Sequence, residues 1–303
     1  MSTRASDPTR TIDAHLHLWD RKVSDYAWIT PELGPLFDDF GPDEARAELD
    51  AAGIDAAILV QAEDSAADTR FMLDVAHEHD WVAGVVGWVP LEHPRRVGAA
   101  LDGFDGEAAL CGIRHLVHDD PRDEFLDLPG VRASLAEVAR RGLAFDVPDA
   151  WPRHLAASAR LARALPELTV VIDHLAKPPV GRDEFDAWLR EFRAVAELPN
   201  TVAKYSGLHL PDVAFGAASV QPLWEIALDA FGPERLMYGG DWPMSVPSGG
   251  YQPTWQVMRG CLDELTTEER AAVLGETAER VYSLRNPTYD GISAAADTET
   301  RVS

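Results

Sequence analysis

The sequence TIDAHLHLW occupies residues 11–19 and is the stretch from which the fold is most directly inferred. Side chains alternate between the two faces of a β-strand, so Asp13, His15, His17 and Trp19 are expected on one face. Burying ionisable groups costs free energy unless they are hydrogen-bonded, bind a metal or act in catalysis. The pattern therefore predicts a strand whose polar face belongs to an active site, although two hydrogen-bonded core histidines would give the same spacing.

Further short apolar runs follow this segment, and longer stretches with helical periodicity separate them. The runs predict strands at residues 11–19, 57–61, 82–88, 112–117, 143–147, 169–174, 201–207 and 235–241. The intervening stretches predict helices near residues 43–52, 66–79, 94–103, 130–141, 151–164, 183–197 and 218–231, and helical sequence near 254–264 and 267–283 follows the last strand. Such alternation is typical of a parallel sheet, and this number of units favours an α/β protein with a closed (β/α)8 TIM barrel. A Rossmann fold is not favoured, because no G-x-G-x-x-G motif follows a strand.

The length of 303 residues suits one such barrel. Residues 11–285 are expected to form this single catalytic domain, and the polar, aperiodic segments 1–10 and 286–303 are expected to be flexible tails. The two cysteines, Cys111 and Cys261, stand far apart in the sequence. This spacing does not favour a disulfide framework or a cysteine zinc site.

The formal net charge is −24, from 27 Lys and Arg against 51 Asp and Glu. This balance disfavours binding to nucleic acid and to anionic membrane surfaces, because phosphate groups are bound by clusters of Lys and Arg. The sequence has neither a signal-peptide pattern nor an apolar run long enough to cross a bilayer. We therefore expect a cytoplasmic protein with a small-molecule substrate, and the oligomeric state stays open.

Ionisable residues recur where the apolar runs stop, which is where (β/α)8 barrels carry their catalytic groups. The sixth run ends in His174, a candidate acid, base or carbonyl polariser. The eighth run ends in Asp241, which we expect to activate water, since burial raises the affinity of a carboxylate for protons. Gly239 and Gly240 precede it and are expected to let substrate or metal approach closely. Alternatively, His174 caps a loop and Asp241 caps a helix.

Cationic and aromatic side chains at other strand ends are candidates for substrate binding. Arg114 and His115 close the fourth run, and only one of them can point into the barrel from a regular strand. Lys204 lies in the seventh run and is expected to bind a carbonyl or anionic oxygen. Lys177 either reaches over the barrel mouth or is only solvated. Tryptophans at strand ends either pack or shape a pocket for a sugar ring, and they are Trp19, Trp88 and Trp242.

Seven short motifs occur in order at the predicted strand ends: DAHLHLW (13–19), LVQA (59–62), GVVGW (84–88), GIRH (112–115), IDHLAKP (172–178), KYSG (204–207) and GDWP (240–243). Over residues 11–285 the sequence resembles the sugar-lactonase branch of the amidohydrolase superfamily, of the L-fuconolactonase and L-rhamnonolactonase type. The 2-pyrone-4,6-dicarboxylate lactonases are more distant in this resemblance.

The resemblance implies a TIM barrel that opens the ring of a sugar (aldono-) lactone, with Asp241 deprotonating the attacking water. It places His15, His17 and His174 in the catalytic site beside this base. It also implies substrate contacts for residues near the carbonyl and hydroxyl or carboxylate groups, which are Gln61, Arg114, His115 and Lys204.

One divalent metal ion is a candidate cofactor. His15, His17 and Asp241 could hold Zn²⁺ together with a water molecule. Metal-dependent members of the superfamily usually add a histidine at the end of the fifth strand, but the run at 143–147 has none. We therefore expect zinc to be non-essential. Two alternatives stay open: a metal-dependent decarboxylase of the same superfamily, and a non-catalytic barrel that binds sugar acids.

Overall fold

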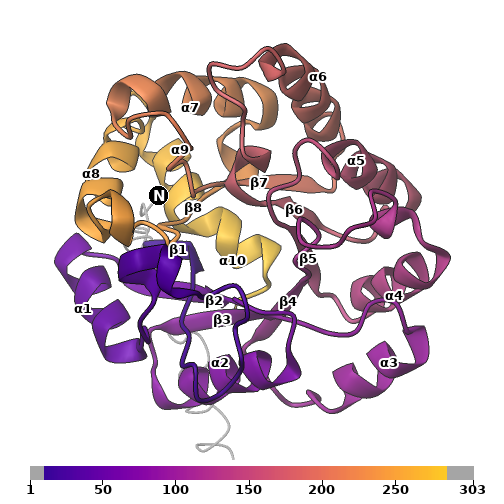
Figure 1. The fold of residues 1–303 in the computed structure, drawn as a ribbon. Coiled ribbons are helices and arrows are strands. Elements are labelled where there is room, and N and C mark those ends of the chain that lie inside the picture. The colour runs from indigo at the N-terminus through magenta and orange to yellow at the C-terminus, as the bar shows by residue number, and fades with distance from the viewer. Residues whose placement is uncertain (1–9, 285–303) are drawn as a thin grey trace, which may run out of the picture.

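Short parallel strands follow one another in chain order around a barrel (Figure 1). In the computed structural model, which describes residues 10–284, eight strands pair in the order β1 to β8. They are β1 (Ile12–Leu16), β2 (Ala56–Val60), β3 (Val82–Gly87), β4 (Leu110–Arg114), β5 (Ala144–Val147), β6 (Val170–Ile172), β7 (Thr201–Tyr205) and β8 (Leu236–Tyr238). The prediction of a (β/α)8 TIM barrel is confirmed. Apart from residue 10, the two predicted tails lie outside the described residues.

Helices surround the barrel, except that α10 lies across its centre in the view of Figure 1. They are α1 (Pro42–Ala52), α2 (Ala66–Glu78), α3 (Pro94–Asp102), α4 (Pro129–Arg140), α5 (Leu155–Ala164), α6 (Phe185–Ala196), α7 (Ala217–Phe231), α8 (Tyr251–Gly260), α9 (Thr267–Ala271) and α10 (Thr277–Val281). A π-helical turn, Ala272–Glu276, joins the last two. No described helix is both long and apolar enough to span a bilayer.

Local sequence explains where several helices begin and end. Proline stands in the first turn of α1, α3 and α4, where its missing N–H has no helical partner to lose. The hydroxyl of Ser65 accepts hydrogen bonds from the N–H groups of Ala67 and Asp68 at the start of α2. Gly53 ends α1 with a φ of 71°, a left-handed conformation that glycine adopts without a Cβ penalty.

The strands are buried on both faces. Their outward side chains pack against the helices, and their inward side chains fill the barrel together with Tyr282, which follows α10. This double burial explains why the strands read as nearly continuous apolar runs rather than as alternating patterns. The polar residues inside the barrel are therefore exceptions that need partners.

Backbone hydrogen bonds between the ends of the chain close the barrel. The N–H of Asp241 donates to the carbonyl of His15 at 2.8 Å, and the N–H of His17 donates to the carbonyl of Trp242 at 2.7 Å. Leu16 and Trp242 form a parallel bridge between these bonds. This β1–β8 seam brings residues 15–17 and 241–242 side by side.

The structure differs from the sequence predictions in three places. The predicted runs extend past the strand ends, so His17, His174 and Asp241 lie in the first residues of loops. The predicted helix at 151–164 begins only at residue 155, after a turn closed by the N–H of His154 and the carbonyl of Ala150. The predicted helix at 267–283 is divided by its π-helical turn.

The expectation that Asp13 shares a face with His15 is wrong. The pairing register of β1 shifts between Asp13 and Leu16, which breaks the alternation of side chains. The carboxylate of Asp13 accepts hydrogen bonds from the hydroxyl of Tyr251 in α8 and from the N–H groups of His15 and Gly240. Asp13 therefore holds the β1–β8 seam against the helical layer.

Candidate active site

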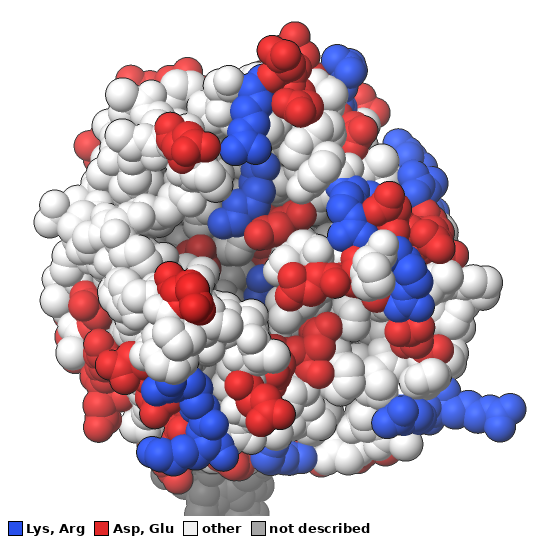
Figure 2. Space-filling model, viewed as in Figure 1, with Lys and Arg blue, Asp and Glu red and all other residues white. Residues whose placement is uncertain are grey.

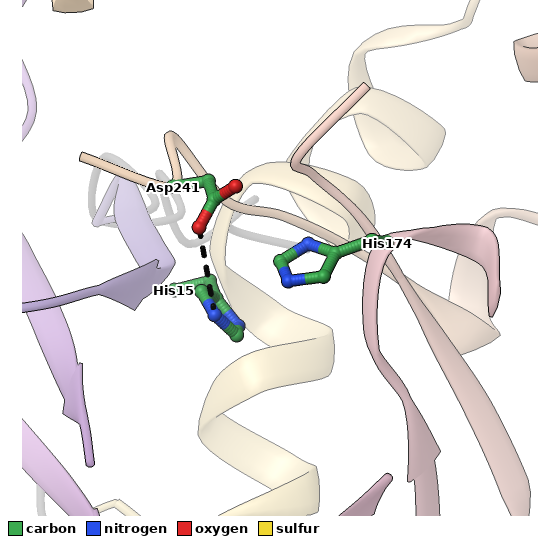
Figure 3. A group of neighbouring side chains, drawn as sticks. All are labelled: His15, His174 and Asp241. Atoms are coloured by element: carbon green, nitrogen blue, oxygen red, sulfur yellow. Dashed lines mark ion pairs between the residues drawn. The ribbon is translucent and has the colours of Figure 1, made fainter. Parts of the chain in front are cut away.

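Histidines from the start of the chain and an aspartate from near its end meet at the C-terminal ends of the strands. His17 Nε2 lies 3.1 Å from His15 Nε2 and 3.5 Å from Asp241 Oδ1. His15 Nε2 lies 3.8 Å from the same carboxylate oxygen, the contact marked by the dashed line in Figure 3. The ring of His174 is directed into this space from the end of β6 (Figure 3). The convergence expected from the sequence is thus observed.

The hydrogen bonds of His15 and His17 define the tautomers of both rings. The carbonyl of Val60 can only accept, so His17 Nδ1, at 2.8 Å from it, carries the proton and leaves Nε2 as an acceptor. His15 Nε2–H can then donate to His17 Nε2, which leaves His15 Nδ1 to accept from the Lys204 ammonium at 3.1 Å. The contacts form one consistent chain from Lys204 to the Val60 carbonyl.

The backbone at His174 and Asp241 has an unusual conformation. Residues 174–177 all have positive φ and form a left-handed turn, in which His174 has a φ of 55°. Asp241 has a φ of 51°. A left-handed residue other than glycine costs about 1–2 kcal/mol. Such conformations persist where the surroundings fix them, and they are concentrated at functional sites.

Glycines near the site make room for protein groups. A Cβ on Gly207, which has a φ of 57°, would lie 2.2 Å from His174 Nδ1 and 2.7 Å from Asp241 Oδ2. A Cβ on Gly239 would lie 2.6 Å from that of His15, and one on Gly240 would lie 2.3 Å from Cε2 of Tyr251. The expectation that the latter two glycines admit substrate or metal is therefore corrected: they admit neighbouring side chains.

A buried ion cluster lies beneath His15. Lys204 is fully buried, and its Nζ is 2.6 Å from Asp146 Oδ2 and 3.3 Å from Asp173 Oδ1. The guanidinium of Arg114 lies against the other oxygen of Asp173, with Nε 3.2 Å away. The hydroxyl of Tyr282 donates to Asp146. Lys204 therefore neutralises carboxylates inside the barrel.

Burial and neighbouring charges shift the pKa values in this cluster in opposite directions. Burial tends to lower the pKa of Lys204, but the negative charges of Asp146 and Asp173 outweigh it and raise the pKa. Burial raises the pKa of Asp146 to about 6 despite the lysine. For Asp173, the positive charges of Lys204 and its neighbours outweigh burial and hold the pKa well below its ordinary value. Of the two carboxylates beside Lys204, Asp173 is therefore the one whose ionised form is favoured.

The pKa shifts at the barrel mouth favour an ionised carboxylate at Asp241 and neutral imidazoles at His15 and His174. Burial lowers the pKa of His174 to about 4, and burial together with the Lys204 charge lowers that of His15 well below its usual range. Burial tends to raise the pKa of Asp241, but His174, His17 and Lys177 outweigh it and lower the pKa. The expectation of a raised proton affinity for Asp241 is therefore corrected. At neutral pH Asp241 is ionised and His174 is uncharged.

A cavity of about 280 Å³ opens above these groups and is called the catalytic cavity here. Its walls come from loops at several strand ends. The lining residues are His17, Trp19, Trp28, Ala62, Arg114, Leu116, His118, Asp119, Asp149, His174, Lys177, Asp241 and Met244. Six of the candidates from the sequence therefore reach the cavity: His17, Trp19, Arg114, His174, Lys177 and Asp241.

The other candidates from the sequence do not line this cavity. They are His15, Gln61, Trp88, His115, Lys204 and Trp242. His15 lies behind His17. Lys204 lies beneath both histidines, because its side chain leaves β7 within the barrel rather than at the mouth.

The remaining four are held by protein contacts. The amide of Gln61 donates to Asp64 at 3.1 Å, and Trp242 is buried against Phe40. The Trp88 indole donates to His115 Nδ1 at 3.1 Å, and the His115 ring stacks on Phe125 with 4.4 Å between centroids. Of the adjacent pair at the end of β4, Arg114 faces the cavity and His115 faces away.

Several residues of the site did not stand out in the sequence. Asp173 directly precedes His174 in the motif at residues 172–178 but is not among the site residues predicted from the sequence. Asp149 and His118 line the cavity from loops, where no periodicity marks them. Trp28 and Met244 add apolar surface from the loops that follow β1 and β8. Loop residues of this kind can be found only once the strand ends are placed in space.

The donor set fits a divalent metal. Zn–N and Zn–O bonds of about 2.0–2.1 Å in a tetrahedral site separate neighbouring donor atoms by about 3.4 Å. The three separations among His15 Nε2, His17 Nε2 and Asp241 Oδ1 are 3.1, 3.5 and 3.8 Å. Asp241 Oδ1 is buried and has no hydrogen-bond partner among the described residues. Donor atoms of His15, His174 and Asp241 also lie within 4.8 Å of one another.

Comparison with known proteins places this chain in a family. The amidohydrolase family model matches residues 12–284. The chain belongs to the amidohydrolase family. It is 34% identical to the L-fucono-1,5-lactonase of Burkholderia ambifaria over 93% of this chain and 98% of that protein. It is 31% identical to the L-fucono-1,5-lactonase of Burkholderia multivorans over 91% of this chain and 97% of that protein.

Solved amidohydrolase structures share the fold. A crystal structure of an amidohydrolase from Burkholderia multivorans with bound HEPES has a TM-score of 0.84 and 30% identity, over 91% of this chain and 100% of that one. A second crystal structure of that amidohydrolase, with bound zinc, has a TM-score of 0.82. The 5-carboxyvanillate decarboxylase of Sphingomonas paucimobilis has a TM-score of 0.62 and 15% identity, which shows a shared fold alone.

Proposed function

We propose that this amidohydrolase opens the ring of a sugar (aldono-) lactone. The observation that carries the proposal is the Asp241 carboxylate, held ionised among three histidines at the floor of the catalytic cavity. The two Burkholderia relatives, each named as an L-fucono-1,5-lactonase, support the same reaction. The cavity volume of about 280 Å³ is near the lower limit for small-molecule sites, which suits a substrate of one ring.

Asp241 is the proposed base. An ionised carboxylate can take a proton from a water molecule as that water attacks the lactone carbonyl. The hydrogen bond from its N–H to the carbonyl of His15 fixes Asp241 at the β1–β8 seam. His17 Nε2, which accepts from His15 Nε2–H in the tautomer described above, lies 3.5 Å from the carboxylate, so the His17 ring borders the space that this water molecule would occupy.

Arg114 and His174 are the proposed donors to the carbonyl oxygen. Arg114 is fixed by a hydrogen bond from Nη1 to the carbonyl of Gln61 at 2.9 Å and by Asp173, so its remaining N–H groups are preorganised. The ring of His174 is fixed by the contact of Nδ1 with Ser206 Oγ at 2.9 Å. Positive charge and aimed N–H groups stabilise the oxyanion that forms when water adds to the carbonyl.

The ring then opens by cleavage of the bond between the carbonyl carbon and the ring oxygen. The proton that Asp241 took from water is returned to the departing alkoxide, which becomes a hydroxyl group. The products are the hydroxy acid and the regenerated carboxylate, so one water molecule is consumed for each ring opened. His15 is proposed to act through His17, which it holds in place from behind.

His15, His17 and Asp241 would hold a zinc ion, and zinc bound there would act as a Lewis acid toward the carbonyl. The proposed zinc site is not essential, because Arg114 already supplies positive charge to the cavity and Lys204 already donates to His15 Nδ1. A metal-bound Nε2 requires the proton of neutral His15 to move to Nδ1, where it would face the Lys204 ammonium.

The reaction is tested by measuring acid release from a panel of lactones with a pH indicator. The panel contains aldonolactones and dicarboxylate lactones, and carbon dioxide release is measured in parallel from aromatic carboxylic acids. We expect acid release from at least one aldonolactone. Carbon dioxide release without acid release would support the decarboxylase alternative instead. Binding of sugar acids with neither activity would support the non-catalytic barrel.

A further inference from the structure

The catalytic cavity continues into a second hollow, the side cleft, of about 580 Å³. Its walls come from loops that follow β4, β5, β6 and β7, and include Trp151, Arg182 and His209. Three residues line both spaces: His118, Asp149 and Lys177. Figure 2 shows this face hollowed near its centre, with acidic and basic side chains around the hollow. The three shared residues form the boundary between the two spaces.

Asp149 combines an uncommon backbone conformation with one buried carboxylate oxygen that lacks a described partner. It lies two residues beyond the end of β5 and has a φ of 44°, which is uncommon for a residue other than glycine. Its Oδ1 is buried and finds no hydrogen-bond partner among residues 10–284. His118 Nδ1 is buried without a described partner as well. Unpaired buried polar atoms beside a cavity point to a ligand that supplies the missing hydrogen bonds.

The chemistry of the boundary restricts what that ligand can be. A carboxylate accepts hydrogen bonds and cannot donate them, so a ligand at Asp149 must bring donors. A phosphate or carboxylate group would be repelled there, and an apolar group would leave the oxygen unpaired. Lys177 donates to the carbonyl of Gly207 at 3.0 Å, which uses one of the three protons of its ammonium. A carboxylate, an imidazole and an ammonium together match hydroxyl groups, which donate and accept.

We propose that Asp149 and His118 bind hydroxyl groups of the substrate and make the site selective for polyhydroxylated lactones. This inference rests on the proposed function and names the part of the substrate that is recognised. The two residues act on binding of the sugar hydroxyls, whereas Asp241 acts on the water. Their removal should therefore affect hydroxylated substrates and spare a lactone with an unsubstituted ring.

The test compares L-fucono-1,5-lactone with δ-valerolactone, which has the same ring size but no hydroxyl groups. The variant is Asp149→Asn, because asparagine also tolerates positive φ and keeps the volume of the side chain. We expect kcat/KM for the hydroxylated lactone to fall roughly 10- to 100-fold, as for loss of hydrogen bonds to a charged group, and kcat/KM for δ-valerolactone to change less than about twofold. Asp183→Asn, at an exposed position, is the matched control and should change neither.

Equal losses on both lactones, or no loss on either, would overturn the assignment of Asp149. His118→Gln is measured in the same way and should show the same selectivity with a smaller loss. If wild-type protein hydrolyses no lactone of the panel, the proposed function fails, and calorimetry then decides the subsite independently. Wild-type protein should bind L-fuconate more tightly than 5-hydroxypentanoate, and Asp149→Asn should abolish that preference. Equal binding of the two acids by wild-type protein would overturn the proposal.

Discussion

The ammonium of Lys204 lies 3.1 Å from His15 Nδ1, so a fully buried cation lies directly beneath the histidines of the candidate active site. The same ammonium contacts Asp146 and Asp173, and no water-exposed surface is left on it. Lys204 thus neutralises charge in the barrel interior and also determines the tautomer of His15. A single substitution of Lys204 is therefore expected to affect the stability of the fold.

Lys204→Met is expected to destabilise the fold by about 3–5 kcal/mol, because two buried carboxylates lose their cation. Urea unfolding followed by circular dichroism would measure the loss. Lys22→Met, at an exposed position, is the control and should stay within about 0.5 kcal/mol of wild type. An unchanged midpoint for Lys204→Met would contradict the ion cluster.

Asp241→Asn is expected to lower kcat for lactone hydrolysis by more than about a hundredfold, because the amide cannot accept the proton of the attacking water. The asparagine keeps the shape of the side chain, so the melting temperature should change little. Acid release with the best lactone of the panel is the measurement, and Asp263→Asn, at an exposed position, is the control. Activity within tenfold of wild type would remove Asp241 from its proposed role.

Gly207→Ala and Gly53→Ala form a matched pair. Both positions have positive φ, 57° and 71°, so each substitution should cost about 1 kcal/mol in backbone strain. The new Cβ at position 53 meets nothing within 4 Å, whereas at position 207 it would displace His174 and Asp241. Only Gly207→Ala should therefore lose activity, and similar kinetics for the two variants would show that the close approach is unimportant.

The stability contribution of Asp68 is expected to depend on pH. Burial raises the pKa of this carboxyl from 3.8 to about 6, although the hydroxyl of Tyr26 donates to it at 2.5 Å. The folded state thus binds the proton more tightly than the unfolded state does, so the contribution is greatest below pH 3.8 and declines as the pH rises to about 6.

Asp68→Asn removes this titration. The free energy of unfolding of wild type relative to the variant should therefore decrease between pH 3.8 and about 6, as measured by urea denaturation. A constant difference between Asp68→Asn and wild type across this interval would contradict the raised pKa.

Removal of metal with a chelator is expected to leave most of the lactonase activity in place. Zinc added back should raise the melting temperature, because a ligand that binds the folded state stabilises it. The increase should disappear in His17→Gln and persist in His77→Gln, whose side chain is exposed on α2. Loss of all activity in the chelator would show that the metal is required.

The architecture could be read from the sequence because a strand buried on both faces leaves a continuous apolar run. The polar residues that interrupt these runs then mark the barrel mouth, which is how His17, His174 and Asp241 could be placed. The choice between Arg114 and His115 could not be made, because it depends on where β4 ends. Asp13 was misplaced because a register shift in β1 leaves no mark on an alternating sequence.

The depth at which a side chain lies in the barrel could not be predicted from the sequence either. Lys204 and Arg114 are both cations near strand ends, yet one lies in the interior and the other faces the cavity. Charge and spacing do not distinguish these positions. The left-handed turn at residues 174–177 is equally hidden, because none of its residues is a glycine.

The β1–β8 seam has a consequence for synthesis of the protein. Backbone hydrogen bonds between residues 15–17 and 241–242 hold Asp241 beside His15 and His17, and more than two hundred residues separate those partners in the chain. A nascent polypeptide that has not yet emerged from the ribosome past Trp242 therefore carries no assembled catalytic centre. Hydrolytic competence should arise in a single late event during translation rather than gradually as the barrel grows.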